Sequence, residues 1–272
     1  MALSINNTSA LFSSRFLNSS QSNLNTAQER LSSGKRINRA SDDAAGLAIA
    51  AKMAQQLLGS QQAYRNTNDG IALAQTADGA ITELQNITQR IGELSVQAAN
   101  GTINDSQRAL LQDEVSSLQD SANQILSSAN YNGINLLDQN GSIDIQVGDQ
   151  TGETVSIETT NLQAQLTSDG LFSVDISTAG GAQTALGQLG GILDSLTKQR
   201  TEFGAAANQL ESTSRNLETE AVSVAASKSQ IMDADYAAEM ASRTNALILQ
   251  NAGIASVAQG NVSNQLAAQL LK

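Results

Sequence analysis

The chain of 272 residues contains no histidine, cysteine, proline or tryptophan. It therefore lacks the usual general base, the thiolate nucleophile and most transition-metal ligands, so the sequence predicts no enzyme activity, no metal site and no cofactor. The net charge of −11 and the pI near 4.4 disfavour nucleic acid and anionic membrane surfaces as partners. An alanine- and leucine-rich chain with 3% aromatic residues favours long helices packed side by side.

The first segment, Met1 to Gln28, has Arg15 as its one charged side chain. It lacks the basic start and the continuous apolar run of a secretory signal peptide, so a cleaved signal is not expected. Apolar residues spaced by seven predict a helix with one apolar stripe. The members of this stripe are Ala10, Leu17, Leu24 and Leu31.

Residues 31–45, LSSGKRINRASDDAA, form a polar island. Gly34-Lys35 raises the possibility of a phosphate-binding loop, and Asp42-Asp43 that of a metal site. A P-loop needs glycine five residues before its Gly-Lys pair and a serine or threonine after the lysine. Those positions hold Glu29 and Arg36. The phosphate interpretation therefore fails.

The same island fits a connection between two helices. Ser33-Gly34 predicts a helix C-cap, and residues 41–43 predict the N-cap of the next helix, which begins in the run AAGLAIAA. We therefore expect an interdomain joint formed by Gly34, Lys35, Arg36, Asp42 and Asp43.

Two helices are predicted next, over residues 81–98 and 111–129, where apolar residues recur at steps of three and four. Residues 100–105 predict the turn between them, with Asn104 or Asp105 as the N-cap. Gly70 and Gly79 each follow an aspartate, but their flanks lack strand alternation and are interpreted as helical.

The β signal is central. SIDIQV (142–147) and ETVSIE (153–158) alternate apolar and polar residues around a GDQTG turn and predict a hairpin, and LFSVDI (171–176) predicts a weaker strand. Aspartate and asparagine residues in this region raise the alternative of calcium binding, but EF-hand spacing is absent and turn chemistry is favoured. These residues are Asp138, Asn140, Asp144 and Asp149.

A heptad pattern from 189 to 231 predicts a long helix that completes an antiparallel three-helix bundle. One heptad position is almost purely apolar, with Leu189, Leu196, Phe203, Leu210, Leu217, Val224 and Ile231. The other position alternates apolar or small residues with Arg200, Ser214 and Lys228, which we expect to fix the register.

The last segment, Thr244 to Leu271, carries no charge, but eight of its 28 residues are Asn or Gln, so it is not expected to cross a membrane. Charge-free amphipathic ends must be buried against protein. This predicts self-assembly, with the ends disordered until neighbouring subunits pack against them. The expected self-assembly residues are Leu17, Leu24, Leu31, Ile248, Ala252, Ala255, Leu266 and Leu270.

LSSGKRINRASDDAAGLAIA resembles the N-terminal signature of bacterial flagellins, which runs ERLSSGxRINxAxDDAAGLAIA. The resemblance continues through YRNTNDGIALAQTADGAITELQNITQRIGELSVQAANGT and returns in IMDADYAAEMASRTNALILQNAGIASVAQGN. It covers Met1 to about Gly133 and about Phe203 to Lys272.

This resemblance implies a mainly α fold and a subunit that polymerises head to tail into the flagellar filament used for swimming. Residues 1–43 and 232–272 would be inner-tube helices that pair as a separate coiled coil. Residues 44–231 would be an outer-tube rod with a β-hairpin insert at about 138–180 and without large projecting domains. A hook–filament junction protein is the alternative.

The resemblance also implies partners and a location. The subunit would leave the cell through the flagellar type III system, without a cleaved signal peptide, to reach the filament. An export chaperone would bind about Asp235 to Lys272, and hook-associated and cap proteins would contact the polymer.

A further implied partner is Toll-like receptor 5, which reads a QRxRELxV stretch and a glutamate on the following helix in many flagellins. Here the stretch is QRIGELSV, so Arg90, Leu94 and Glu114 match the pattern and Gly92 replaces its second arginine. Leu94 also lies on the apolar stripe of its helix, which gives it an alternative role in the core.

Overall fold

The computed structural model describes the backbone of residues 8–270, and the side chains of residues 11–260 and of Val262. It is mainly helical, as the sequence predicts, and its residues group into two units. The terminal unit consists of Met1–Leu57 and Ser223–Lys272, and the rod unit of Leu58–Val222. The boundaries between the units fall within helices α2 (Ala44–Ala99) and α5 (Ala179–Met232).

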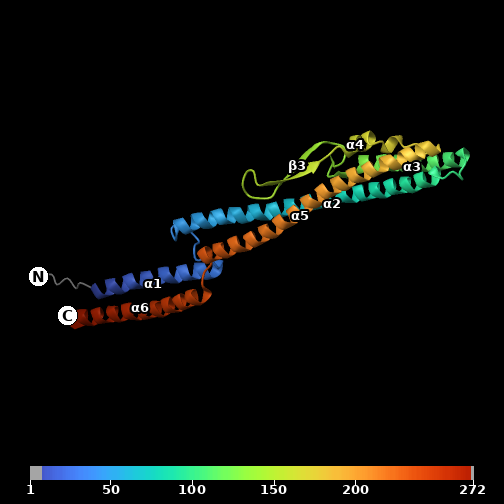
Figure 1. Ribbon diagram of the computed structural model, residues 1–272. Helices are drawn as coiled ribbons and strands as arrows, with labels where there is room; N and C mark the ends of the chain where they lie inside the picture. The colour runs from blue at the N-terminus through green and yellow to red at the C-terminus, as the bar shows by residue number, and fades with distance from the viewer. Residues whose placement is uncertain (1–7, 271–272) are drawn as a thin grey trace. The chain divides into compact units, whose positions relative to one another are not determined.

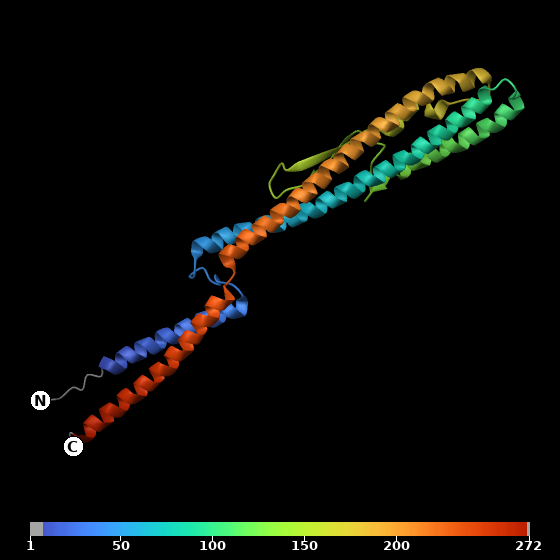
Figure 2. The same cartoon turned by 60° about the horizontal axis from the view of Figure 1, so that its bottom comes forward.

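In the terminal unit, α1 (Thr8–Ser33) and α6 (Tyr236–Leu270) lie side by side and antiparallel (Figures 1 and 2). Near the joint, Arg30 Nη1 lies 3.0 Å from Glu239 Oε1. Farther along, a Cβ placed on Gly253 would lie 3.8 Å from the Cβ of Leu17. The two helices are therefore close along their described length.

In the rod unit, α2 and α5 pack with α3 (Asp105–Ser128) as the predicted antiparallel three-helix bundle (Figure 1). The predicted turn before α3 is confirmed, because Asn104 and Gln107 form a reciprocal capping box. The buried guanidinium of Arg108 donates to the carbonyl oxygens of Ala98 and Asn100, at 2.8 and 3.2 Å. These bonds satisfy carbonyls at the C-terminal end of α2, which no later turn of that helix can reach.

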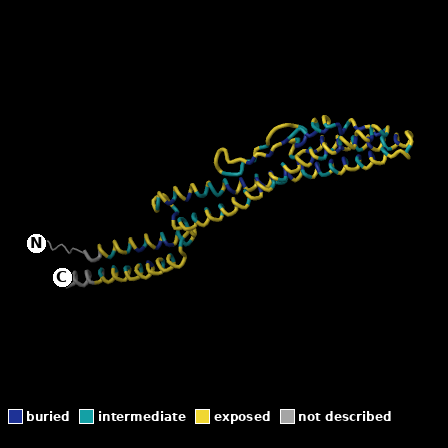
Figure 3. Tube along the Cα trace, in the orientation of Figure 1, coloured by how far each residue is buried: buried dark blue, intermediate teal, exposed yellow. Residues whose placement is uncertain are grey.

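Buried apolar residues from all three long helices of the rod unit form one core, and Figure 3 shows where the buried positions lie along the chain. The predicted apolar position of α5 is largely confirmed, because Leu196, Phe203 and Leu210 are each at most 1% exposed. The prediction that Arg200 occupies the second inward heptad position of α5 is wrong by one residue. Arg200 is exposed and donates to Asp78 Oδ1 at 2.7 Å, whereas Gln199 is the buried polar residue. Inward positions of α5 begin with a step of three from Leu189, not four.

The predicted hairpin is confirmed with a shift of one residue. Strands β3 (Gly141–Gln146) and β4 (Thr154–Thr159) pair antiparallel, with Ile143 opposite Ile157. Alternate residues of β4 are buried, which places one face of the hairpin against the helices. Gly70 lies beneath it, since a Cβ there would approach Ile145 Cγ1 to 3.1 Å.

The sequence analysis missed a second hairpin, formed by β1 (Asn130–Tyr131) and β2 (Ile134–Asn135). Its loop, Asn132-Gly133, has φ values of 51° and 82°. Both central residues of a type I′ turn need positive φ, and Asn-Gly is the pair that adopts this most readily. The Asn132-Gly133 dipeptide was therefore the signal in the sequence that could have predicted this hairpin.

The predicted strand at 171–176 is wrong. A short helix α4 (Leu162–Ser168) is followed by a 3₁₀ turn η1 (Leu171–Ser173), and among residues 8–270 no strand pairs with this segment. Glutamines of α3 supply its hydrogen bonds instead. Gln119 Nε2 donates to the carbonyl oxygen of Leu171 at 2.8 Å, and the N–H of Ile176 donates to Gln112 Oε1 at 2.7 Å.

The four residues considered for calcium have separate roles. Asn135 Nδ2 donates to Asp138 Oδ2, the N–H of Asn161 donates to Asn140 Oδ1, and the hydroxyl of Ser156 donates to Asp144 Oδ1. Asp149 lies at the hairpin tip, against Gly59 of α2. Turn and hairpin contacts therefore account for their positions.

Replacement of glycine by alanine should have opposite effects on stability at two helical positions. At Gly190 an added Cβ would meet nothing within 4 Å, so Gly190→Ala should raise the free energy of unfolding by about 0.5–1 kcal/mol through helix propensity. At Gly59 the Cβ would lie 2.5 Å from the Cβ of Asp149, so Gly59→Ala must displace the hairpin tip. We expect Gly59→Ala to lower stability by about 1–3 kcal/mol through overpacking.

Urea unfolding of both variants, followed by ellipticity, tests this pair. Equal stabilisation by both substitutions would contradict the close approach of the hairpin tip to α2.

Candidate assembly and recognition surfaces

The joint is held by backbone pairing between two segments of the terminal unit. Gly34 has φ of 70° and donates its N–H to the carbonyl of Arg30, so it is the predicted C-cap of α1. Lys35 then forms an antiparallel bridge with Asp233, in which the Arg36 N–H donates to Met232 O at 2.7 Å and the Ala234 N–H donates to Gly34 O at 3.0 Å. We call this pairing the clamp.

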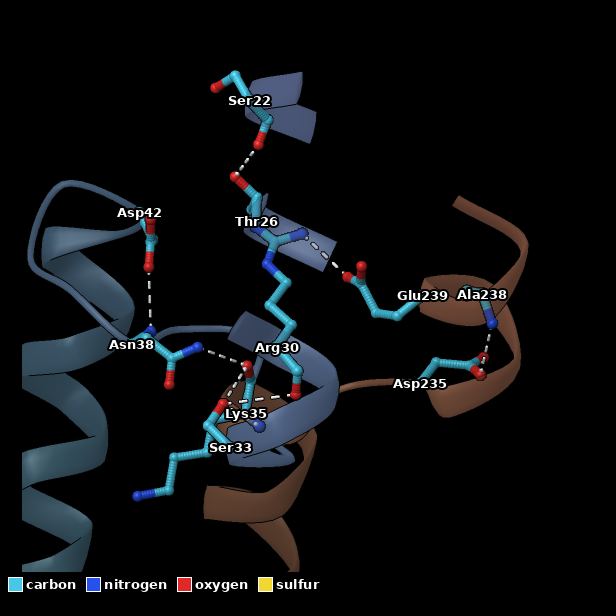
Figure 4. Close-up of polar contacts among 10 residues, drawn as sticks. All are labelled: Ser22, Thr26, Arg30, Ser33, Lys35, Asn38, Asp42, Asp235, Ala238 and Glu239. Carbon is cyan, nitrogen blue, oxygen red and sulfur yellow. Dashed lines mark hydrogen bonds and ion pairs between the residues drawn. The ribbon is translucent and has the colours of Figure 1, made fainter. Parts of the chain in front are cut away.

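The two aspartates of the joint bind backbone amides. Asp42 Oδ2 accepts from the N–H of Arg39 at 2.9 Å and from the N–H of Asn38 at 3.0 Å, the second of which Figure 4 shows. These bonds favour the carboxylate and hold the pKa of Asp42 below its ordinary value of 3.8. Asp43 accepts from the N–H of Gly46 at 2.8 Å and caps α2, as predicted.

The start of α6 lies against the end of α1. Asp235 Oδ1 caps α6 by accepting from the N–H groups of Ala237 and Ala238. One turn later, Glu239 forms its ion pair with Arg30 across the two helices (Figure 4). The side chain of Glu239 is 14% exposed, so this pair is partly shielded from water.

The line of contact between α1 and α6, here called the seam, is only weakly apolar. On α1 the predicted residue Leu24 is buried, and Leu17 and Leu31 are half-buried. Beyond Glu239 and Arg243, which lie near the joint, the α6 positions at alternating steps of three and four that are at least half-buried are Ala246, Gln250, Gly253, Val257 and Gly260. Small and polar residues there offer the leucines of α1 little apolar surface.

Large apolar side chains of both helices lie outside the buried positions of the seam and remain exposed. The predicted assembly residues Ile248, Ala252 and Ala255 are exposed, while the side chains of Leu266 and Leu270 lie outside the described residues. The sequence analysis missed several more, although large apolar residues outside the periodic positions of nearly charge-free helices were a usable signal. The outward residues that are between 52% and 71% exposed are Leu11, Phe12, Phe16, Ile248, Leu249 and Ile254.

The residues matched to the receptor pattern are only partly brought together. Arg90 Nη2 donates to Glu114 Oε1 at 2.8 Å, and Arg90 Nη1 donates to Glu93 Oε2 at 2.8 Å, all on the surface of the rod unit. Its bonds to Glu114, then those to Glu93, raise the pKa of Arg90. Leu94 is 2% exposed and belongs to the core. Gly92 is half-buried near Leu189.

Asp42 predicts an acid-sensitive contribution to the stability of the joint. Because its folded-state pKa is depressed, the stabilisation is fully present above the unfolded-state value and is lost as the pH falls through the lower folded-state pKa. Asp42→Asn should therefore show a shallower loss of stability than the parent chain between about pH 5 and about pH 2.

Urea midpoints across this range provide the measurement. Asp69→Asn, which removes an exposed carboxylate from α2, controls for net charge. Identical acid profiles for the parent chain and Asp42→Asn would disprove the linkage.

Within the residues that the structure describes, no group of three or more carboxylates is placed to hold a metal ion, and no helix is long and apolar enough to cross a membrane. What the geometry offers is a capped joint, a weakly packed helix pair with an outward apolar surface, and an exposed arginine–glutamate pair.

Two family models match the chain. The bacterial flagellin N-terminal helical region matches residues 5–142, and the bacterial flagellin C-terminal helical region matches residues 186–271. A flagellin of Halalkalibacterium halodurans is 40% identical over 254 residues, which span 92% of this chain and 93% of the relative. A flagellar filament core protein of Brachyspira hyodysenteriae is 38% identical over 285 residues, which span 98% and 99%.

Two solved structures are also similar to this chain. The crystal structure of Bacillus cereus flagellin matches with a TM-score of 0.52 and 28% identity, covering 56% of this chain and 88% of that one. A putative flagellar hook-associated protein of Vibrio parahaemolyticus shares the fold, with a TM-score of 0.59 at 13% identity, covering 71% of this chain and 100% of that one. The chain belongs to the bacterial flagellin family and is a structural subunit of the flagellar filament, not an enzyme.

Proposed function

We propose that this subunit assembles through the outward apolar surface of the paired helices α1 and α6. The observation that carries the proposal is the distribution of apolar side chains. Phe16 is 71% exposed and Ile248 is 60% exposed, whereas the α6 side of the seam is lined largely by small and polar residues. Burial of an exposed side chain of this size is worth about 1.5–3 kcal/mol, which copies of the chain can gain by packing together.

The charge pattern supports the same surface. From Thr244 onward the described part of α6 carries no charged residue, and α1 carries only Arg15 before Glu29. A surface without charges can be buried without the desolvation penalty of unpaired ions. In this proposal Leu17, Leu24 and Leu31 hold the pair together, and Ile248, Ala252 and Ala255 face neighbouring copies.

The same proposal assigns parts of the chain to the two tubes of the filament. Residues 1–43 and 232–272 form the inner tube, and residues 44–231 form the outer tube with its hairpin. The C-terminal segment from Asp235 is the segment for an export chaperone to cover before assembly, because its apolar surface would otherwise be exposed to water. Export through the flagellar type III system and contacts with hook-associated and cap proteins belong to the same proposal.

A second proposed role is recognition by Toll-like receptor 5 at the rod unit. Support comes from the Arg90–Glu114 pair, which is exposed and offers charged groups from two adjacent helices. Leu94 supports this surface from the core and does not itself contact the receptor.

Substitution of one outward apolar residue should weaken assembly. Ile248→Ser removes exposed apolar surface and should raise the critical concentration for growth on filament seeds by roughly tenfold to a hundredfold. Thermal unfolding of the free chain should be unchanged, because this side chain is already exposed. Sedimentation and negative-stain electron microscopy measure the polymer.

The matched control is Asn251→Ser, which removes no apolar surface from the same helix. A chain truncated before Thr244 should not grow on seeds at all. If Ile248→Ser polymerised at the parental critical concentration, the outward surface would not drive assembly.

Restoring the second arginine of the receptor pattern should strengthen recognition. A Cβ at Gly92 would lie 3.7 Å from Leu189 Cδ1, an ordinary contact, so Gly92→Arg needs no backbone shift. We expect the concentration for half-maximal activation of a receptor reporter cell to fall about tenfold, as for a central arginine contact.

Gly190→Arg adds the same charge at an exposed glycine on α5 and serves as control. An equal gain from both arginines would show that net charge, and not the Arg90–Glu114 surface, is responsible.

A further inference from the structure

The pairing register of α1 and α6 continues that of the clamp. In the clamp, Arg36 faces Met232 and Gly34 faces Ala234. Moving along α1 away from the joint, Arg30 meets Glu239, Gln21 accepts a hydrogen bond from Gln250, and Leu17 contacts Gly253. Each step back along α1 is matched by a nearly equal step forward along α6, so a single antiparallel register runs from the clamp into the helices.

Beyond the Arg30–Glu239 pair beside the joint, the helices themselves carry little information that could select this register. Coiled coils usually specify register by charged pairs flanking the seam and by large apolar residues that fit matching gaps. Here Arg15 has no charged residue to meet on α6 between Thr244 and Val262. Gly253, Val257 and Gly260 of the seam are small, so a slide by one heptad replaces one small residue by another opposite Leu17.

The clamp, by contrast, is specific. It comprises the two backbone hydrogen bonds of the Lys35–Asp233 bridge, and Arg36 Nη2 adds a third bond to the carbonyl of Ile231 at 2.8 Å. The left-handed conformation of Gly34 turns the chain from α1 into the bridge. The hydroxyl of Ser229 donates to Asp233 Oδ2 at 2.6 Å and fixes the opposite segment at the end of α5.

We propose that the clamp sets the register in which α1 and α6 pair, with Arg36 as a positioning residue. Bringing together two segments that are distant in sequence has an entropic cost of loop closure. The hydrogen bonds of the clamp offset this cost at the joint. Each following turn of α1 and α6 then closes only a short additional loop. The helices zip outward from the clamp, and a seam poor in register signals still gives one pairing.

Cysteine cross-linking tests this, because the parent chain has no cysteine. Leu17→Cys with Gly253→Cys reports the observed register, since their Cβ atoms would lie 3.8 Å apart, within the span of a disulfide. Leu17→Cys with Gly260→Cys reports a slide of one heptad. Each pair is grown on parental filament seeds and oxidised, and intrachain disulfides are separated from interchain dimers on non-reducing gels.

Two substitutions break the clamp. Ala234→Pro removes the N–H that donates to Gly34, and Arg36→Ala removes the bond to Ile231. We expect the ratio of observed-register to slid disulfide to fall about tenfold with Ala234→Pro, as for the loss of one or two hydrogen bonds, and less with Arg36→Ala. Lys35→Ala keeps the backbone bridge and should leave the ratio unchanged.

A parental ratio in both clamp variants, or an equal fall with Lys35→Ala, would overturn the proposal. If a clamp variant does not enter filaments, the same ratios are measured on the free chain in ammonium sulfate, which favours buried states. Failure of the parent chain to grow on seeds counts against the assembly surface instead, so the two proposals fail separately.

Discussion

Two paired helices share a single line of contact, and each can bury only the residues that lie along it. This limit makes the two units differ in how completely their apolar side chains are buried. Leu196 and Phe203 of the rod unit are buried in a core shared with two further helices and a hairpin, whereas Phe16 and Ile248 of the terminal unit remain exposed on the pair α1 and α6. The terminal unit is therefore incomplete as a hydrophobic core, and in the proposed assembly neighbouring copies of the chain complete it.

Charge placement is consistent with this limit. The acidic residues all lie between Glu29 and Glu239, so the net charge of −11 is carried outside the two ends. Self-repulsion can then keep free chains soluble without opposing the burial of α1 and α6. The ion pair that does join these helices, Arg30 with Glu239, lies beside the joint, where it can remain paired when the outward surface is covered.

Sequence reasoning succeeded where one periodicity dominates. The bundle, the hairpin and the charge-free ends follow directly from spacing and composition. It failed where two spacings compete, because Leu189 permits an inward step of three or four and the choice between Gln199 and Arg200 depends on the neighbouring helices. It also failed at 171–176, where alternation resembled a strand but Gln112 and Gln119 of α3, far away in sequence, supply the hydrogen bonds. The clamp was invisible for the same reason, since its partners are about two hundred residues apart.

The polar island shows why residue types alone can suggest chemistry at what is a joint, as the sequence analysis concluded. A phosphate site needs backbone N–H groups that are free, and a cation site needs carboxylate oxygens that are free. At the joint the N–H of Arg36 is donated to Met232. The carboxylate of Asp42 accepts from backbone amides of its own loop, and that of Asp43 accepts from a backbone amide in the first turn of α2. Glycine, lysine and aspartate gather there because a helix must end, cross and restart within ten residues, from Gly34 to Asp43. The hydrogen-bonding capacity that could have served a ligand is used to turn the chain.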